Sequence, residues 1–460
     1  MCWATRQRSG LRTWAATTAA SWARQPLGRK LPAPLPASTT TVGWWRASSI
    51  CTPSCSPRPV LPLPDALAAA GLWGGLGLVA HTYVLFPALL ARLARGRQQN
   101  TDLYVPDSPE LPRVDVLLAV YNEEQVIEQK IHSTFATTYP PDKLTFYIGS
   151  DNSSDRTNAL VEQLARQYPQ LQFRPFGQRT GKPGVMEALS AEATAPVLVL
   201  TDANVFFTPD TLYHLVKHFR NPRVGQVGGN ILNPDHRQDG ISGQEKAYLE
   251  RENLIKYQEG VVWGSMIGAF GGCFAVRRAC YHPAPRTFIV DDFFISMAVL
   301  QDGYQALNEL AAVCHEDVSD KLPEEFRRKA RISAGNFQNL VAFRRLLWPP
   351  WRGVSFAYWS HKVLRWLTPL LLLLMLLCNA LLVLRGAGWF YQLMLAGQVA
   401  APALVLLDGA LHRAGVHLRL LRFITHFYSM NGALLLGLGR FLRGVKTTIW
   451  EPTQRFQHKR

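Results

Sequence analysis

The sequence predicts an α/β domain with a mostly parallel sheet, flanked on both sides by helices that could span a membrane. Two observations predict the domain. Short apolar runs alternate with amphipathic segments between residues 112 and 346, and several of these runs end in acidic loops. A third observation predicts the flanks, because long apolar stretches precede and follow the domain. A chain of 460 residues is ample for such a core.

Residues 1–64 form a basic, low-complexity leader that contains no Asp or Glu. Pro, Ser, Thr, Ala and Trp dominate it, so we expect disorder rather than a packed core. This composition is typical of a transit peptide, but an upstream extension from a misplaced start codon also explains it. We favour the extension, because no cleavage site or amphipathic pattern stands out.

Apolar length predicts the membrane segments. The predicted spans are residues 66–93, 363–384 and 389–411. Residues 423–439 are shorter and carry His426 and Asn431, so we expect either a further span or a re-entrant segment there. Residues 347–362 combine aromatic and basic side chains, which predicts an interfacial segment.

The charge pattern predicts orientation. The formal net charge is +16, and the basic residues gather at the ends of the apolar stretches and in a tail over residues 440–460. This distribution favours a multi-pass protein of the cell membrane over a nucleic-acid binder, with its basic segments and its domain on the cytoplasmic side. We therefore expect membrane lipid, and no nucleic acid, among its partners.

Within the domain, apolar runs and helical periodicity alternate in order along the chain. The predicted strands are residues 114–120, 144–149 and 196–200, and the predicted helices are residues 124–136, 156–167 and 209–219. Tyr121, Asp151 and Asp202 follow the three strands. Because parallel strands end at one edge of a sheet, we expect these side chains to meet there. For Ser153, Ser154 and Asp155 we favour helix capping.

Three local motifs carry a family resemblance. They are Tyr121-Asn122-Glu123, Ser150-Asp151-Asn152-Ser153-Ser154-Asp155 and Gly181-Lys182-Pro183-Gly184. Together they resemble the membrane-bound, cellulose synthase-like and hyaluronan synthase-like members of glycosyltransferase family 2. The resemblance implies a GT-A fold (nucleotide-diphospho-sugar transferase) for residues 112–346 and a UDP-sugar donor. It also implies that Tyr121, Glu123, Asp151 and Lys182 bind the nucleotide, with Asp151 against the uracil ring.

Thr201-Asp202-Ala203-Asn204 stands where the family carries Asp-x-Asp. The resemblance implies that Asp202, which also contacts the donor, and Asn204 hold Mg or Mn on the diphosphate. Hard oxygen ligands suit either ion, which neutralises charge as the nucleoside diphosphate leaves. Asn204 replaces the second carboxylate and offers a neutral carbonyl.

Val290-Asp291-Asp292 resembles the family's catalytic acid motif. The resemblance implies that Asp292 is the base that accepts the proton of the acceptor hydroxyl, with Asp291 beside it. A paired, desolvated carboxylate has a raised pKa, which suits a base. Two acids at a helix start could instead be helix caps. Phe270-Gly271-Gly272-Cys273 resembles the small-residue turn beside the acceptor sugar.

Arg328-Lys329-Ala330-Arg331-Ile332 stands where processive members carry Gln-x-x-Arg-Trp. The resemblance implies that Arg331 stabilises the diphosphate, while Arg328 replaces the glutamine near the donor. Ile332 replaces the tryptophan that stacks on the acceptor sugar. Near the end, Trp450-Glu451-Pro452-Thr453-Gln454-Arg455 resembles the Trp-x-x-Thr-x-Arg signature of synthase-like members.

The sequence therefore predicts a membrane-bound, inverting, metal-dependent glycosyltransferase that uses a UDP-sugar and a saccharide acceptor in polysaccharide synthesis. The alternatives are a single transfer to a lipid acceptor and a catalytically inactive membrane adaptor. Polysaccharide and lipid-linked acceptors are thus both open, and the sequence names no partner subunit.

Overall fold

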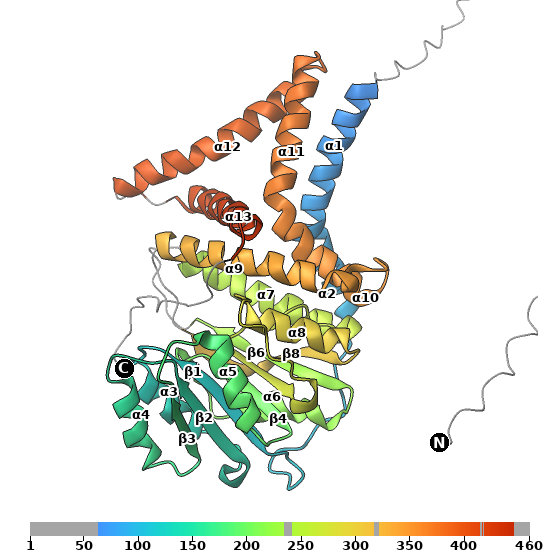
Figure 1. The fold of residues 1–460 in the computed structure, drawn as a ribbon. Coiled ribbons are helices and arrows are strands. Elements are labelled where there is room, and N and C mark those ends of the chain that lie inside the picture. The colour runs from blue at the N-terminus through green and yellow to red at the C-terminus, as the bar shows by residue number, and fades with distance from the viewer. Residues whose placement is uncertain (1–62, 234–241, 317–321, 415, 417, 446–460) are drawn as a thin grey trace, which may run out of the picture. The chain divides into compact units, whose positions relative to one another are not determined.

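The structure is a computed structural model that describes residues 63–233, 242–316, 322–414, 416 and 418–445 (Figure 1). The described residues form one compact unit by their contacts. Most of the predicted leader, residues 1–62, and the Trp450 to Arg455 motif lie outside the described residues.

The described part of the domain is built on an eight-stranded sheet with the order β3-β2-β1-β4-β7-β6-β8-β5. The strands are β1 (Val114–Val120), β2 (Leu144–Ser150), β3 (Leu171–Pro175), β4 (Val197–Thr201), β5 (Val205–Phe207), β6 (Val224–Leu232), β7 (Cys273–Arg277) and β8 (Gln305–Glu316). β1 pairs in parallel with β2 and β4, and β2 with β3. β7 runs antiparallel to both β4 and β6. β8 pairs in parallel with β6 and antiparallel with β5, so the sheet is mixed.

Helices cover both faces of this sheet, because side chains of β1 alternate between two apolar clusters. The helices of the domain are α3 (Ile127–Phe135), α4 (Thr157–Ala165), α5 (Gly181–Glu192), α6 (Thr211–Val216), α7 (Ser242–Trp263), α8 (Asp291–Gln301) and α9 (Leu322–Ala342). Leu117 packs in a cluster with Val185 of α5, whereas Val116 and Leu118 pack in a cluster with Ile131 of α3. A strand buried on both faces explains its uninterrupted apolar sequence. Short turns of helix, η2 (Pro141–Lys143), η3 (Lys217–Arg220) and η4 (Arg278–Cys280), join some of these elements.

Three described helices are long and apolar enough to cross a membrane. They are Leu63–Ala94, Gly353–Leu384 and Trp389–Leu411. The first consists of α1 (Leu63–Ala80), η1 (His81–Leu85) and α2 (Phe86–Ala94). The second consists of α10 (Gly353–Ala357), η6 (Tyr358–Val363) and α11 (Leu364–Leu384). The third lies in α12 (Trp389–Arg413). The second begins inside the segment that we predict at the interface, after η5 (Arg344–Leu347).

The last described helix, α13 (Arg419–Leu442), is not among those three candidates. It packs along α9, with a hydrogen bond from the Ser333 hydroxyl to the carbonyl of Leu434. Figure 1 shows α9 and α13 side by side, between the sheet and the apolar helices α11 and α12. Whether residues 423–439 cross or re-enter a membrane stays a prediction.

Candidate active site

The predicted site residues come from neighbouring parallel strands. Asp151 follows β2, Tyr121 follows β1 and Asp202 follows β4, and these strands lie side by side in the order β2-β1-β4. Parallel pairing brings the carboxyl ends of the three strands to one edge of the sheet. Asp291 and Asp292 reach the same edge from the start of α8.

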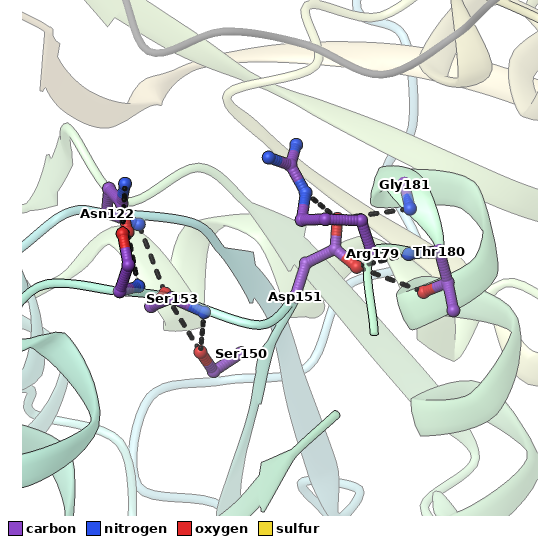
Figure 2. A network of polar contacts seen from close by, with 8 residues as sticks. Asn122, Ser150, Asp151, Ser153, Arg179, Thr180 and Gly181 are labelled. Atoms are coloured by element: carbon purple, nitrogen blue, oxygen red, sulfur yellow. Dashed lines mark hydrogen bonds and ion pairs between the residues drawn. The ribbon is translucent and has the colours of Figure 1, made fainter. Parts of the chain in front are cut away.

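Asp151 is fully buried, and donors from the loop before α5 occupy both of its carboxylate oxygens (Figure 2). Oδ1 accepts hydrogen bonds from the Thr180 N–H (2.6 Å) and hydroxyl (3.1 Å). Oδ2 accepts from the Gly181 N–H (3.1 Å) and from Arg179 Nε (3.0 Å). Arg179 also covers the ring of Tyr121, with Cζ 3.3 Å from the centroid. Asp151 therefore fastens α5 to β2, and its contact with a uracil ring stays a prediction.

The loop after β1 is held against the loop after β2 (Figure 2). The Asn122 N–H donates to Ser153 Oγ (3.1 Å), and the Glu123 N–H donates to Thr157 Oγ1 (2.9 Å). Asp155 Oδ1 accepts from the Thr157 N–H (3.0 Å), so Asp155 caps the start of α4. The capping interpretation is thus confirmed for Asp155, while Ser153 joins the two loops.

Lys182 connects the acidic residues of two elements. Its ammonium donates to Asp202 Oδ1 (2.7 Å) and lies 3.8 Å from Asp291 Oδ2. Burial of Lys182 opposes its charge, but the carboxylates of Asp202 and Asp291 outweigh this effect and raise the pKa of the lysine. A permanently charged lysine at this edge is available to an anionic diphosphate, which is the role that the sequence predicts for it.

Asp292 has the environment of a carboxylate base. Burial and the neighbouring charge of Asp291 raise the pKa of Asp292 to about 6, against the opposing effect of Lys182. Oδ1 accepts from the Phe293 N–H (2.7 Å), which leaves Oδ2 turned toward Gly271. A Cβ atom at Gly271 would stand 2.6 Å from that oxygen, so the glycine provides the space for the carboxylate.

The Phe270 to Cys273 turn is bonded to the loop of Asp202. The carbonyl oxygen of Gly272 accepts from the Thr201 hydroxyl (2.9 Å) and from the Asp202 N–H (3.2 Å). Thr201 pairs with Cys273 in the β4–β7 ladder. The antiparallel strand β7 thereby places the turn between the acidic loop and Asp292.

The residues predicted to hold a metal ion fit a cation that also binds a diphosphate. The side chain of Asp202 is 37% exposed, and it lies in a group of three carboxylates with one lysine. The amide nitrogen of Asn204 donates to Glu316 Oε1 (3.1 Å), which leaves Asn204 Oδ1 as its possible ligand atom. The described residues include no group of three or more His, Cys, Asp or Glu side chains that could hold a metal ion by themselves. Mg²⁺ is commonly held by one or two carboxylates together with substrate phosphates and water.

Lys130 is a supporting residue that the sequence analysis missed. It is fully buried, and its ammonium donates to Thr201 Oγ1 (2.8 Å) and to the carbonyl of Val205. Burial lowers the pKa of Lys130 to about 8, while nearby groups including Asp202 oppose the shift. The sequence feature that could have identified Lys130 is its position near Ile127 and Ile131 on the buried face of α3. Lys130 secures both ends of the loop that carries Asp202.

Arg328 and Arg331 lie on α9. Arg328 forms an ion pair with Glu325 (Nε to Oε2, 3.0 Å). Partial burial lowers the pKa of the Arg331 guanidinium, against the opposing effects of Asp291 and Asp202. Arg331 is thus within electrostatic reach of the acidic edge.

Comparison with known proteins decides the family. Residues 115–282 match the model described as glycosyl transferase family 2. These residues form a glycosyl transferase family 2 domain. The match covers the strands that carry Tyr121, Asp151 and Asp202, as well as the Phe270 turn.

Curated relatives share this part of the family 2 chain. A β-monoglucosyldiacylglycerol synthase of Synechocystis sp. is 27% identical over 218 residues, which are 45% of this chain and 44% of the relative. The probable glycosyltransferase YdaM of Bacillus subtilis is 30% identical over 54% of this chain and 60% of the relative. A poly-β-1,6-N-acetyl-D-glucosamine synthase of Staphylococcus aureus is 25% identical over 50% of this chain and 56% of the relative. The chain thus spans about half the length of these relatives.

A solved structure shows the same fold. The mannosyltransferase PcManGT from Pyrobaculum calidifontis, in complex with GDP-Man and Mn²⁺, superposes with a TM-score of 0.62 at 22% identity. The similarity covers 83% of this chain and 99% of that chain. The expected GT-A fold with flanking apolar helices is therefore confirmed.

Proposed function

We propose that this family 2 protein transfers a sugar from a UDP-sugar to a saccharide acceptor, with inversion at the anomeric carbon, and thereby builds a polysaccharide. The observation that carries the proposal is the meeting of Asp202, Lys182, Asp291 and Asp292 at one edge of the sheet. A capping role alone does not account for a lysine held between carboxylates of different elements. Nor does it account for a glycine that makes room for Asp292.

Donor binding uses the loops after β1 and β2 and the start of α5. Tyr121, Glu123 and Asp151 form the base-binding side, and Lys182 and Arg331 face the diphosphate. Asp202 and Asn204 would hold Mg or Mn, which supplies charge neutralisation of the diphosphate when bound. The Mn²⁺ in the complex of PcManGT supports the use of such an ion.

The transfer is a single displacement. The acceptor hydroxyl oxygen forms a bond to the anomeric carbon, and its proton passes to the Asp292 carboxylate. The bond from the anomeric carbon to the diphosphate breaks, and UDP leaves with the electron pair. A pKa of about 6 suits Asp292 to this work, because the group is ionised near neutral pH and is still basic enough to accept the proton.

Transfer to a lipid acceptor is the second candidate. Ile332 stands where a sugar-stacking tryptophan is expected in processive members, and one relative is named β-monoglucosyldiacylglycerol synthase. The relative named as a poly-N-acetylglucosamine synthase supports the polymer instead. The helix of Arg331, α9, packs on α13, which in turn contacts α11 and α12. This packing supports an approach of either acceptor from the side of the apolar helices.

We place the enzyme in the cell membrane as a multi-pass protein with its domain in the cytoplasm. The three apolar helices and the similarity to a β-monoglucosyldiacylglycerol synthase support membrane association. The basic ends of these helices support the orientation.

The test is nucleotide release by detergent-solubilised protein with a panel of UDP-sugars and GDP-mannose, each with Mg, Mn or EDTA. We expect release from at least one UDP-sugar with a divalent ion, and products sized on a saccharide and on diacylglycerol identify the acceptor. Nucleotide release from GDP-mannose alone would contradict the UDP-sugar donor and indicate a GDP-sugar instead. Release from none of the donors would overturn the transferase proposal.

A further inference from the structure

Lys256 is a buried lysine that the proposed reaction does not yet use. It lies on α7 and is 2% exposed. Its ammonium stands 3.2 Å from the centroid of the Phe270 ring. Among the residues that the structure describes, its ammonium forms no ion pair or hydrogen bond, so the ring of Phe270 is its close contact. A desolvated cation over an aromatic face gains more than an exposed one.

The glutamates nearest to Lys256 in sequence are engaged elsewhere. Glu252 contacts His361 Nε2 (3.0 Å) and accepts from Arg365 (2.8 Å). Glu259 contacts His361 Nδ1 (2.7 Å) through one oxygen, and its other oxygen accepts from a backbone N–H. Titratable and charged groups from three neighbouring parts of the chain face the lysine. α7 contributes Glu252 and Glu259, and α8 contributes Asp292. The helix of η6 and α11 contributes His361, Lys362 and Arg365.

Phe270 links Lys256 to the reacting edge. It begins the turn in which Gly271 lies against Asp292 Oδ2 and Gly272 accepts hydrogen bonds from the Asp202 loop. Asp292 also favours the charged form of Lys256. Interaction between two ionisable groups is reciprocal, so the charged lysine favours the ionised form of Asp292.

We propose that Lys256 is a positioning residue of the transfer reaction, which holds Phe270 and thereby the turn that lies against the Asp292 carboxylate. It acts through Phe270 and does not touch the reacting atoms. The proposal rests on the proposed function, because it assigns a support to the base and to the acceptor side of the same site.

A pH dependence follows from this arrangement. Burial and then Lys362 lower the pKa of Lys256 to about 7, while Glu252, Asp292 and Glu259 oppose the shift. Above that pH the lysine becomes neutral and loses its attraction to the Phe270 ring. Turnover should therefore fall on the alkaline side as Lys256 loses its proton.

The experiment compares Lys256→Met with the wild-type protein in turnover, nucleotide affinity, thermal unfolding and pH profile. Methionine keeps the length and removes a buried charge, so the variant should unfold at the same or a higher temperature. Turnover should fall roughly threefold to thirtyfold, the range of a cation–π contact, with nucleotide affinity unchanged. In the pH profile of turnover, the acid limb should move to higher pH, because the charge that favours ionised Asp292 is gone. The alkaline limb should disappear, because no lysine remains to lose its proton.

Lys217→Met is the matched control, because Lys217, on η3, is a half-buried lysine that forms an ion pair with Glu309 of β8. It should keep the wild-type pH profile. Phe270→Leu is the second variant, which keeps Lys256 and removes its ring. We expect its turnover to fall and its alkaline limb to disappear, since the ring through which the charge of Lys256 acts is gone.

A wild-type rate and pH profile in both Lys256→Met and Phe270→Leu would overturn the proposal and leave the transferase function intact. An equal loss of nucleotide binding and turnover in a folded Lys256→Met variant would also overturn it. If Lys256→Met does not fold, the Phe270→Leu profile decides. Absence of wild-type turnover with every donor would instead remove the proposed function.

Discussion

At the scale of single residues, the properties of each carboxylate in the site depend on its immediate neighbours. The sequence predicts Asp291 and Asp292 as a pair, and the structure adds the lysine that separates Asp291 from Asp202 and the glycine that faces Asp292. These neighbours are distant in sequence, so no local pattern reveals them. The two carboxylates consequently have different surroundings, and Asp292 has the raised pKa.

The first prediction concerns the acid limb of the pH profile. Asp292 must be ionised to accept a proton, and its pKa is raised to about 6, so turnover should rise as pH increases through about 6. Asp291→Asn removes the adjacent negative charge, which lowers the pKa of Asp292 and moves the limb to lower pH. Glu187→Gln, at an exposed pair with Arg286, is the control. An unmoved limb in Asp291→Asn would contradict the coupling of the two carboxylates.

The second prediction concerns the space beside Asp292. Gly271→Ala places a Cβ atom 2.6 Å from Asp292 Oδ2, so the carboxylate must move. We expect turnover to fall by about tenfold or more, since small displacements of a catalytic group are costly, while nucleotide affinity is kept. Gly439→Ala, where a Cβ atom meets nothing within 4 Å, should leave turnover unchanged. Full activity of Gly271→Ala would contradict the need for this space beside the Asp292 carboxylate.

At the scale of elements, three of the four parallel strands beside the site, β1, β2 and β4, could be predicted from sequence, whereas the short edge strand β3 was not. β1, β2 and β4 are short, mostly buried apolar runs that local sequence reveals. Their predicted bounds lie within a residue of those observed. β6, β7 and β8 were not predicted, because their pairing is long-range and β7 reverses direction. The charged contacts between α7 and the helix at His361 were also missed, since each residue appears alone in sequence.

The third prediction concerns those contacts. Glu252 is 2% exposed and bonds His361, Lys362 and Arg365, so Glu252→Gln leaves buried cations without a counter-charge. We expect a loss of about 3 kcal/mol or more in the free energy of unfolding. Glu250→Gln on the exposed side of α7 is the control. Denaturant unfolding in detergent measures both, and equal stabilities would contradict a structural role for the network.

The network also has a pH signature. Although burial acts to raise it, the adjacent cations hold the pKa of Glu252 well below its ordinary value. A carboxylate with a lowered folded-state pKa stabilises the protein above its unfolded-state pKa, and this contribution is lost as pH falls. Wild-type protein should therefore lose stability on acidification below the ordinary range of glutamate, and Glu252→Gln should lose less.

At the scale of the whole molecule, the family 2 domain is attached to helices that are long and apolar enough to cross a membrane. Length and apolar composition predict these helices, because a span needs about 20 apolar residues. The relation of α13 to the domain could not be predicted, since it depends on packing against α9.

The fourth prediction concerns membrane association. The protein should stay with the membrane pellet after a strongly alkaline carbonate wash, because apolar spans cannot be released by removing charge contacts. A peripheral membrane protein in the same preparation, which the wash releases, is the control. Recovery of the chain in the supernatant would contradict the spans.

The central claim is that Asp292 is the base of a glycosyl transfer, and its most direct test is the turnover of Asp292→Asn. The account predicts a loss on the order of a hundredfold to ten-thousandfold, with nucleotide binding kept. Asp302→Asn, at the far end of α8 in an exposed pair with His282, should keep wild-type turnover. Turnover of Asp292→Asn at the wild-type rate would contradict the account.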